Sequence, residues 1–292
     1  MEFFTHEKLS PRVTRIRDTA GTCMYLAEGA ARAALLDTGV GLGDLKAYVE
    51  TLTDKPVTVV VTHGHVDHAM GAGPFGCAYL SPLDEELYAL HAALENRRNY
   101  VAGGAVRGGA ADLLAQVGES DWQTPLPFEK FRPLAPGDFF DLGGLTLEVH
   151  EGAGHTKGCV TMLLREERML LLGDAVNGFT FLFDTADTGG RPGKFCLSPA
   201  AYRQMLLRLK QATDGRYDRC LFCHGDGDGP ADTIDGVLAV VEDILAGKDD
   251  QVPFSAMNHA NDNLRLAKAM DFARFCRADG GVGNVIYDPA LL

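Results

Sequence analysis

The chain has 292 residues, of which 46% are hydrophobic and 23% are charged, and its formal charge at pH 7 is −13. This length and composition are typical of a soluble globular protein with a substantial core. The negative charge argues against nucleic acid as a partner, because binding to a phosphate backbone needs a cationic face.

The sequence also argues against export and membrane insertion. No window approaches the roughly 18 to 20 uninterrupted apolar residues that a membrane span needs. The first 18 residues lack the apolar core of a signal peptide. The 7 cysteines are scattered through the chain, which suits a reducing compartment better than a disulfide framework. We therefore expect a cytoplasmic protein.

The first predicted elements are three short strands, at residues 13–18, 22–27 and 31–37, that form a meander. A helix at 45–52 leads to a buried strand of β-branched residues at 57–62, and a tight glycine turn leads to a strand near 77–80. The next helix is predicted to begin with Ser81 as its N-cap and Pro82 in its first turn. Its packing face is expected to carry four leucines: Leu83, Leu87, Leu90 and Leu94.

A helical and glycine-rich insertion is predicted at about 81–130. Four glycines, Gly103, Gly104, Gly108 and Gly109, make a stable element unlikely in its middle, so we expect the insertion to be helical first and mobile afterwards. It is either a lid over a substrate site or a surface loop without a role, and the sequence leaves both open.

The second half returns to alternating strands and helices. Strands are predicted at 145–150, 159–164, 169–172 and 219–223, and helices after Ser198-Pro199, where Met205, Leu206 and Leu209 point inward, and at 234–245. A last amphipathic helix is expected at about 261–276, followed by an edge strand at 284–287. Because no linker or short repeat divides the chain, we predict one domain over 1–292.

The stretch VTVVVTHGHVDHAM at 57–70 carries the strongest functional pattern. The buried strand ends in His63, His65, Asp67 and His68, four side chains that can bind metal ions. Side chains two apart in an extended loop point the same way, so His63 and His65 can hold one ion while the other two turn to a second. A purely structural role is a poor explanation, because three imidazoles and a carboxylate packed together are costly without a cation.

Three further candidate ligands lie far away in the sequence. His155 lies between two predicted strands, Asp174 just after a strand, and His224 at the end of another. Since every candidate follows a strand, all of them can meet at one rim of the fold. We predict a two-metal site.

These motifs, THGHVDH at 62–68, GHT at 154–156, LLGDA at 171–175 and CHG at 223–225, make the chain resemble the metallo-β-lactamase superfamily. The resemblance implies a four-layer αββα sandwich with two sheets face to face. It assigns the first metal site to His63, His65 and His155, and the second to Asp67, His68 and His224. Asp174 resembles the carboxylate that bridges both metals.

Asp37 resembles the family's acid that steadies the ligands from behind, with an ordinary turn at a strand end as the alternative. The departures from the family narrow the substrate. β-Lactamases have a cysteine or no ligand at the position of Asp174, glyoxalase II enzymes differ around His224, and nucleases with a large inserted domain need more residues between these two positions. Lactonases and thioesterases are among the remaining classes.

The expected chemistry is metal-assisted hydrolysis. Two divalent ions about 3.5–4 Å apart can hold a bridging water and lower its pKa toward about 7, which makes hydroxide available to attack a carbonyl carbon. Asp67 is the candidate catalytic residue that accepts the proton and passes it to the leaving group. Imidazole and carboxylate ligands suit zinc, our first choice, and also iron or manganese. We expect a small-molecule substrate, and an oligomer is possible.

Other functions stay open. A mononuclear iron sulfur dioxygenase, active on a persulfide, would need only His63, His155 and Asp174 as ligands. A phosphodiesterase also stays open, because the choice of substrate depends on the loops. A binding protein with an inert site fits poorly, because every ligand is present.

The remaining motifs have simpler interpretations. The run Cys220-Leu-Phe-Cys223-His224 matches a haem attachment pattern, but without an export signal a chance match on a buried strand explains it better. Cys159 is expected to be a core residue. Phe179, Phe181 and Phe183 either fill the core, which we favour, or line an apolar pocket. Arg97, Arg98 and Arg107 could meet an anionic group, although solvated charges are the simpler explanation.

Overall fold

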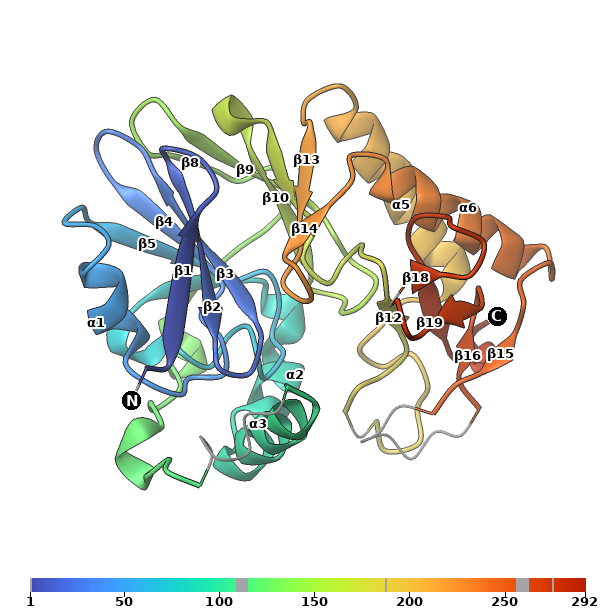
Figure 1. The fold of residues 1–292 in the computed structure, drawn as a ribbon, viewed down its shortest axis with the longest axis horizontal. Helices are drawn as coiled ribbons and strands as arrows, with labels where there is room; N and C mark the ends of the chain where they lie inside the picture. Colours follow the sequence, from blue (N-terminus) through green and yellow to red (C-terminus); the bar gives the residue numbers. More distant parts are fainter. Residues whose placement is uncertain (1, 109–114, 187, 256–262, 275) are drawn as a thin grey trace. The chain divides into compact units, whose positions relative to one another are not determined.

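A computed structural model describes residues 2–108, 115–186, 188–255, 263–274 and 276–292. The chain forms two compact units, drawn in Figure 1. Unit 1 comprises Met1–Glu148, Leu164–Glu167 and Cys223–Gly227. Unit 2 comprises Val149–Leu163, Arg168–Phe222 and Asp228–Leu292. That the whole chain is one domain stays a prediction.

Unit 1 is built on a sheet with the strand order β1-β2-β3-β4-β5-β6-β7 among the described residues. Its strands are β1 Phe4–Lys8, β2 Val13–Asp18, β3 Cys23–Glu28, β4 Ala33–Leu36, β5 Val57–Val60, β6 Ala78–Leu80 and β7 Phe131–Pro133. Strands β1 to β4 pair antiparallel and β4 to β7 pair parallel. The predicted meander and the interior position of the ligand-bearing strand are confirmed, whereas β1 was not predicted.

The parallel pairing of β4 and β5 places two functional loops together. Helix α1, Leu45–Glu50, connects the two strands, and its first turn is capped by Asp44, whose Oδ1 accepts a hydrogen bond from the Ala47 amide at 3.0 Å. Parallel strands have their carboxyl ends at the same edge of a sheet. Asp37 after β4 and His63 after β5 therefore lie at one edge.

The insertion is more ordered than the sequence suggests. A 3₁₀ turn, Pro82–Asp84, leads into α2, Glu85–His91, and α3, Leu94–Gly108. The prediction that the glycine-rich stretch forms no stable element is wrong for Gly103, Gly104 and Gly108, which lie within α3. Gly109 falls outside the described residues. Short 3₁₀ turns follow at Glu119–Asp121 and Phe128–Lys130.

The predicted leucine face of the insertion is also wrong. Ser81 does cap the turn, but Leu83 is 70% exposed, and Leu90 and Leu94 are partly exposed, whereas Leu87 is buried. The 3₁₀ turn and the break between α2 and α3 change the direction in which successive side chains point. Tyr88, next to Leu87, completes the buried face instead.

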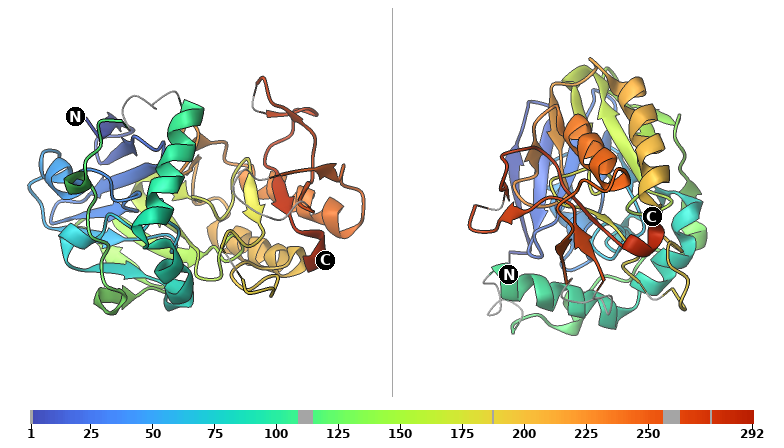
Figure 2. Two further views of the ribbon diagram at one scale, coloured as in Figure 1. Left: turned by 90° about the horizontal axis from the view of Figure 1, so that it is seen from below. Right: turned by 90° about the vertical axis from the view of Figure 1, so that its right-hand side faces the viewer.

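Unit 2 contains a second sheet. Strands β10 Val160–Leu164, β11 Met169–Leu171, β13 Arg219–Leu221 and β14 Asp228–Gly229 follow one another across it, and β9 Thr146–Glu151 pairs beside β10. The beginning of β9 pairs with β8, Phe139–Asp141, in unit 1. Helices α5, Pro199–Thr213, and α6, Thr233–Leu245, lie side by side in Figure 2. Met205, Leu206 and Leu209 are buried, as predicted.

The C-terminal region forms strands where we expected a helix. A small sheet has the order β12-β19-β16-β15, with β12 Thr180–Leu182, β15 Val252–Pro253, β16 Arg265–Leu266 and β19 Val285–Tyr287, and a hairpin joins β17 Met270–Asp271 to β18 Cys276–Arg277. The helix predicted at 261–276 is therefore wrong, although part of that range lies outside the described residues.

The pattern of burial explains this correction. Leu264 and Leu266 are both buried, with the alternation of a strand, and β16 pairs antiparallel with β19. The strand predicted at 284–287 is confirmed, but it lies between β12 and β16 and is not at an edge.

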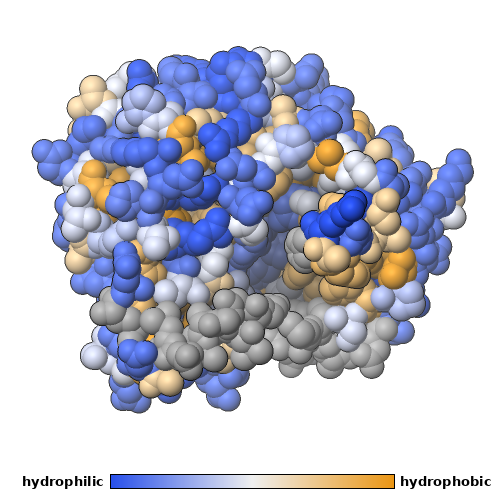
Figure 3. Space-filling view, in the orientation of Figure 1, coloured by the Kyte–Doolittle hydropathy of each residue, from blue (hydrophilic) through white to orange (hydrophobic). Residues whose placement is uncertain are grey.

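The hydropathy of the surface and of the helices agrees with the balance of hydrophobic and charged residues in the sequence. On the face drawn in Figure 3, hydrophilic residues predominate, with apolar residues scattered between them. In the described part of the chain, none of the helices is both long and apolar enough to cross a membrane.

Candidate metal centre

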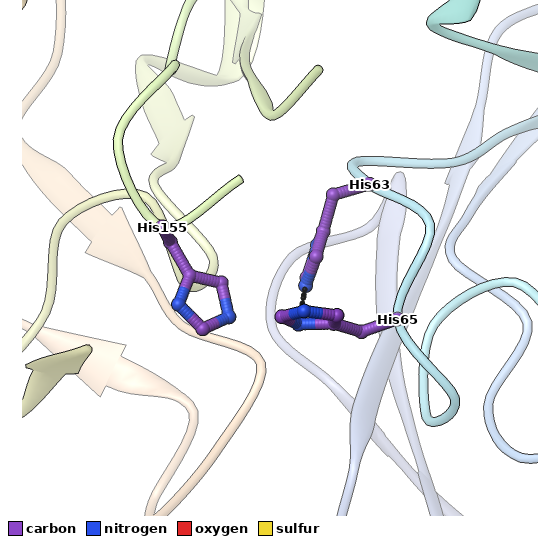
Figure 4. Close-up of side chains that lie close together, drawn as sticks. All are labelled: His63, His65 and His155. Atoms are coloured by element: carbon purple, nitrogen blue, oxygen red, sulfur yellow. Dashed lines mark hydrogen bonds between the residues drawn. The ribbon is translucent and has the colours of Figure 1, made fainter. Parts of the chain in front are cut away.

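The loop after β5 holds two histidine rings against each other. His63 Nε2 lies 3.0 Å from His65 Nδ1, as the dashed line in Figure 4 shows. The Thr62 hydroxyl lies 3.0 Å from the other nitrogen of His63, which fixes the ring. At metal–nitrogen distances of 2.0–2.1 Å, tetrahedral ligand atoms lie roughly 3.3 Å apart. The two nitrogens are thus spaced as ligands of one ion; His155, also drawn in Figure 4, belongs to unit 2.

A second group of ligand atoms lies beside the first in unit 1. Asp67 Oδ2 is 3.5 Å from His68 Nε2 and 3.2 Å from His224 Nε2. These distances again match the edges of a coordination tetrahedron. Burial of Asp67 raises its pKa, but the ion pairs and hydrogen bonds with His68 and His224 outweigh burial and hold the pKa well below its usual range.

Asp37 orients His68 from behind. Its Oδ2 lies 2.8 Å from His68 Nδ1, so the ring presents Nε2 to Asp67. Its Oδ1 accepts a hydrogen bond from the Thr62 amide at 2.7 Å, and the backbone at Asp37 is left-handed, with φ of 64°. A carboxylate that fixes the far nitrogen of a histidine is the usual support of a metal ligand.

His224 reaches unit 1 because its segment is tied to β2 and β3. Four backbone carbonyls of the segment accept hydrogen bonds from these strands. From β3, the Cys23 amide donates to the Cys223 carbonyl and the Tyr25 hydroxyl to the Gly227 carbonyl, both at 2.7 Å. From β2, Arg17 donates to the Gly225 carbonyl at 2.7 Å and Arg15 to the Asp226 carbonyl at 2.5 Å. Cys223 Sγ also lies 3.3 Å from Asp37 Oδ2. Cys220 and Cys223 are fully buried, which agrees with a chance match to the haem pattern.

Unit 2 carries the remaining two candidates next to each other. His155 Nε2 lies 3.7 Å from Asp174 Oδ2, and both residues are buried. The Phe181 carbonyl in β12 accepts a hydrogen bond from His155 Nδ1 at 2.9 Å, which directs Nε2 toward Asp174. The C-terminal sheet therefore positions this ligand.

The side chains in both units fit a divalent cation. Each group offers only imidazole nitrogens and carboxylate oxygens, the donor set of zinc and also of iron or manganese. The rings of His63 and His68 have centroids 4.0 Å apart and no solvent exposure. Such close packing of buried imidazoles is costly without a cation.

Comparison with known proteins identifies the family. A model of the metallo-β-lactamase superfamily matches residues 17–224, more than half of the chain. The chain belongs to this superfamily. The solved metallo-β-lactamase from Pontibacter korlensis superposes with a TM-score of 0.55 at 20% identity, over 82% of this chain and 99% of that one. The one from Erythrobacter litoralis gives 0.54 at 18%, over 83% and 98%. The predicted α/β fold of the metallo-β-lactamase type is confirmed.

Two curated proteins are similar to this chain in sequence. The acyl-coenzyme A thioesterase MBLAC2 of Gallus gallus is 25% identical over 60% of this chain and 67% of its own. An uncharacterized protein of Mycobacterium tuberculosis is 27% identical over 64% of this chain and 81% of its own.

The superfamily motifs do not reveal every residue around the ligands. Asp84 Oδ2 accepts a hydrogen bond from the Gly64 amide at 2.8 Å, and His91 Nδ1 accepts one from the Val66 amide at 3.0 Å. The Tyr100 hydroxyl donates to Asp67 Oδ2 at 2.6 Å. All three lie in the insertion, and the sequence indicated a role beside the ligands for none of them.

One arginine of the insertion, Arg97, has a different role from either one that we considered. Arg97 is 2% exposed and donates hydrogen bonds to the carbonyls of Val40, Gly41 and Gln123, at 2.7–2.9 Å. It therefore anchors α3 to the loop after β4. Arg98 is exposed and lies 3.5 Å from Glu119, and the side chain of Arg107 lies outside the described residues.

Phe183, one of the three aromatic residues after Asp174, and Cys159 belong to the core of unit 2. Phe183 is buried in a small cluster with the C-terminal strands, and Phe179 and Phe181 pack against that cluster while partly exposed. This confirms the core interpretation for Phe183. Cys159 is buried in the main core of the unit, also as predicted.

Proposed function

We propose that this superfamily member is a hydrolase that uses two divalent metal ions, with zinc as the first candidate, on an ester, lactone or thioester of a small molecule. His63, His65 and His155 would hold one ion and Asp67, His68 and His224 the other. Asp174 would bridge the two. The proposal combines the ligand groups found in each unit with the motif order of the superfamily.

The arrangement of Asp67, His68 and His224 carries the proposal. A mononuclear dioxygenase needs none of these three as ligands. Here the Nε2 atoms of His68 and His224 lie 3.5 and 3.2 Å from Asp67 Oδ2. Asp37 fixes the other ring nitrogen of His68, Nδ1. Such support is expected where a second ion binds.

The chain's own residues have distinct tasks in the reaction. Bound divalent ions would lower the pKa of a water molecule and polarise the substrate carbonyl. Among the described residues, the hydrogen bond and ion pairs of Asp67 all use Oδ2. Oδ1 is then available to accept a proton from the nucleophile and return it to the leaving group.

An acyl thioester is the first substrate class to test. The thioesterase relative supports this choice, at 25% identity. A carboxylate at position 174, where β-lactamases have a cysteine or no ligand, argues against a β-lactam. A thiolate is also a good leaving group, so a thioester makes modest demands on the general acid.

The test combines metal analysis with a substrate panel. The purified protein would be assayed with acyl-coenzyme A thioesters, lactones, a phosphodiester, a chromogenic β-lactam and, by oxygen uptake, a persulfide. We expect hydrolysis of a thioester or another ester that a chelator abolishes. Oxygen uptake without hydrolysis, or turnover confined to the β-lactam, would overturn the proposal.

Variants separate a two-metal from a one-metal enzyme. His224→Ala should remove one metal equivalent and most of the hydrolysis. His6→Ala is the matched control, because among the described residues the His6 side chain is hydrogen-bonded to Tyr48 and not to a candidate ligand. If His224→Ala kept full activity, the second ion would have no role.

A further inference from the structure

The insertion touches the ligand loop at three successive points. Asp84 holds the Gly64 amide, His91 holds the Val66 amide and Tyr100 holds the Asp67 carboxylate. The His91 ring also stacks on His65, with centroids 4.9 Å apart and planes 25° from parallel. The loop is therefore fixed on one side by β5 and on the other by residues of the 3₁₀ turn before α2, of α2 and of α3.

These contacts come from an anchored helix. Arg97, one turn before Tyr100 on α3, buries its guanidinium on three backbone carbonyls, those of Val40, Gly41 and Gln123. Residues three apart on a helix share a face, so the Arg97 anchor sets the height and direction of Tyr100. If the insertion opened as a lid, all of these hydrogen bonds would break at once. Opening would therefore cost free energy, because donors and acceptors that remain buried would lose their partners.

We propose that Tyr100 is a positioning residue that fixes the Asp67 carboxylate, and that α2 and α3 form a fixed wall of the metal centre and not a lid. The hydroxyl donates to Oδ2, the oxygen that also faces His68 and His224. This hydrogen bond prevents rotation of the carboxylate and keeps Oδ2 for the ion and Oδ1 for the proton. The inference rests on the proposed two-metal hydrolase.

The substitution Tyr100→Phe isolates this effect, because it removes one hydroxyl and keeps the ring. Loss of a group that orients a metal ligand typically costs 10- to 100-fold in metal affinity or activity. We expect the more weakly held ion to dissociate about 10-fold more readily in a chelator competition. We also expect kcat to fall by a similar factor while KM stays unchanged, since Tyr100 acts through Asp67 and not on the substrate.

Two further measurements exclude a general loss of structure. Tyr88→Phe also removes a buried hydroxyl hydrogen bond from the insertion, but its partner is a backbone carbonyl. This control should keep both metal affinities and kcat. In the cobalt-substituted protein, Tyr100→Phe should change the visible absorption of the ion bound by Asp67, and Tyr88→Phe should not.

The outcomes distinguish this inference from the proposed function. Two ions and hydrolysis in the wild type, with wild-type metal affinity, spectrum and kcat in Tyr100→Phe, would overturn the role of Tyr100 alone. Equal losses in Tyr100→Phe and Tyr88→Phe would also overturn it, because the effect would then be structural. A wild-type protein that binds fewer than two ions would overturn the proposed function and this inference together.

Discussion

Asp37→Asn should weaken the second metal site while leaving the fold intact. The amide oxygen can still accept hydrogen bonds from the Thr62 amide and hydroxyl, which Asp37 Oδ1 now accepts at 2.7 and 3.0 Å. The amide nitrogen would then replace Oδ2, which lies 2.8 Å from His68 Nδ1. Two N–H groups cannot face each other, so the His68 proton must move to Nε2, the atom that binds the ion.

The expected loss of metal affinity follows from the replacement of the carboxylate oxygen beside His68 by an amide nitrogen. Loss of a carboxylate behind a ligand histidine costs 10- to 100-fold in metal affinity, about 1.4–2.8 kcal/mol. The fold should lose less than about 1.5 kcal/mol, the net contribution of one hydrogen bond. Asparagine also tolerates the left-handed backbone at this position, where φ is 64°, so no new strain arises.

The assay is a metal-binding titration of chelator-treated protein, with urea unfolding as the measure of stability. Asp44→Asn is the control, because asparagine caps a helix as well as aspartate does and Asp44 caps α1. If Asp37→Asn bound both ions as tightly as the wild type, the argument that Asp37 sets the tautomer of His68 would be wrong.

Three further predictions concern other residues. Arg97→Met leaves three carbonyls without their donor and should lower the free energy of unfolding by on the order of 3–5 kcal/mol in urea, whereas Arg98→Met at the surface should change it by less than about 0.5 kcal/mol. Burial raises the pKa of Asp18 to about 6 from 3.8, so the folded protein binds the proton more tightly and loses stability as pH rises from about 4 to 6. The free energy of unfolding of chelator-treated Asp18→Asn should therefore rise relative to wild type by on the order of 2–3 kcal/mol between pH 4 and pH 7. Equal pH profiles of the two proteins in urea unfolding would contradict this. Asp174→Ala should lose most hydrolysis and one metal equivalent, measured by elemental analysis, and an active variant with both ions would count against a bridging role.

The sequence was sufficient where one local pattern decides both structure and chemistry. The run Val57–Val60 predicts a buried strand, and the four polar residues in the following loop are rarely placed together without a metal. The meander of β2 to β4 has short strands with clear turns between them, so the pairing is local and predictable.

The predictions from sequence failed where contacts between residues far apart in the chain determine the structure. Residues around Leu264 and Leu266 suit a helix in isolation, and only pairing with β19, about twenty residues later, makes them a strand. Arg97 looks like a solvated helix residue until the carbonyls of Val40 and Gly41 are brought to it by the fold. Tyr100 lies in an ordinary helix, and nothing in its neighbours indicates that it reaches Asp67.

The most direct test of the two-metal hydrolase is a stepwise zinc titration of chelator-treated protein with hydrolysis of an acyl thioester or lactone as the readout. The account predicts that activity keeps rising until two equivalents of zinc per chain are bound, and that His224→Ala stops rising at one equivalent with little activity. Full activity at one equivalent in the wild type, or hydrolysis that needs no metal, would contradict it.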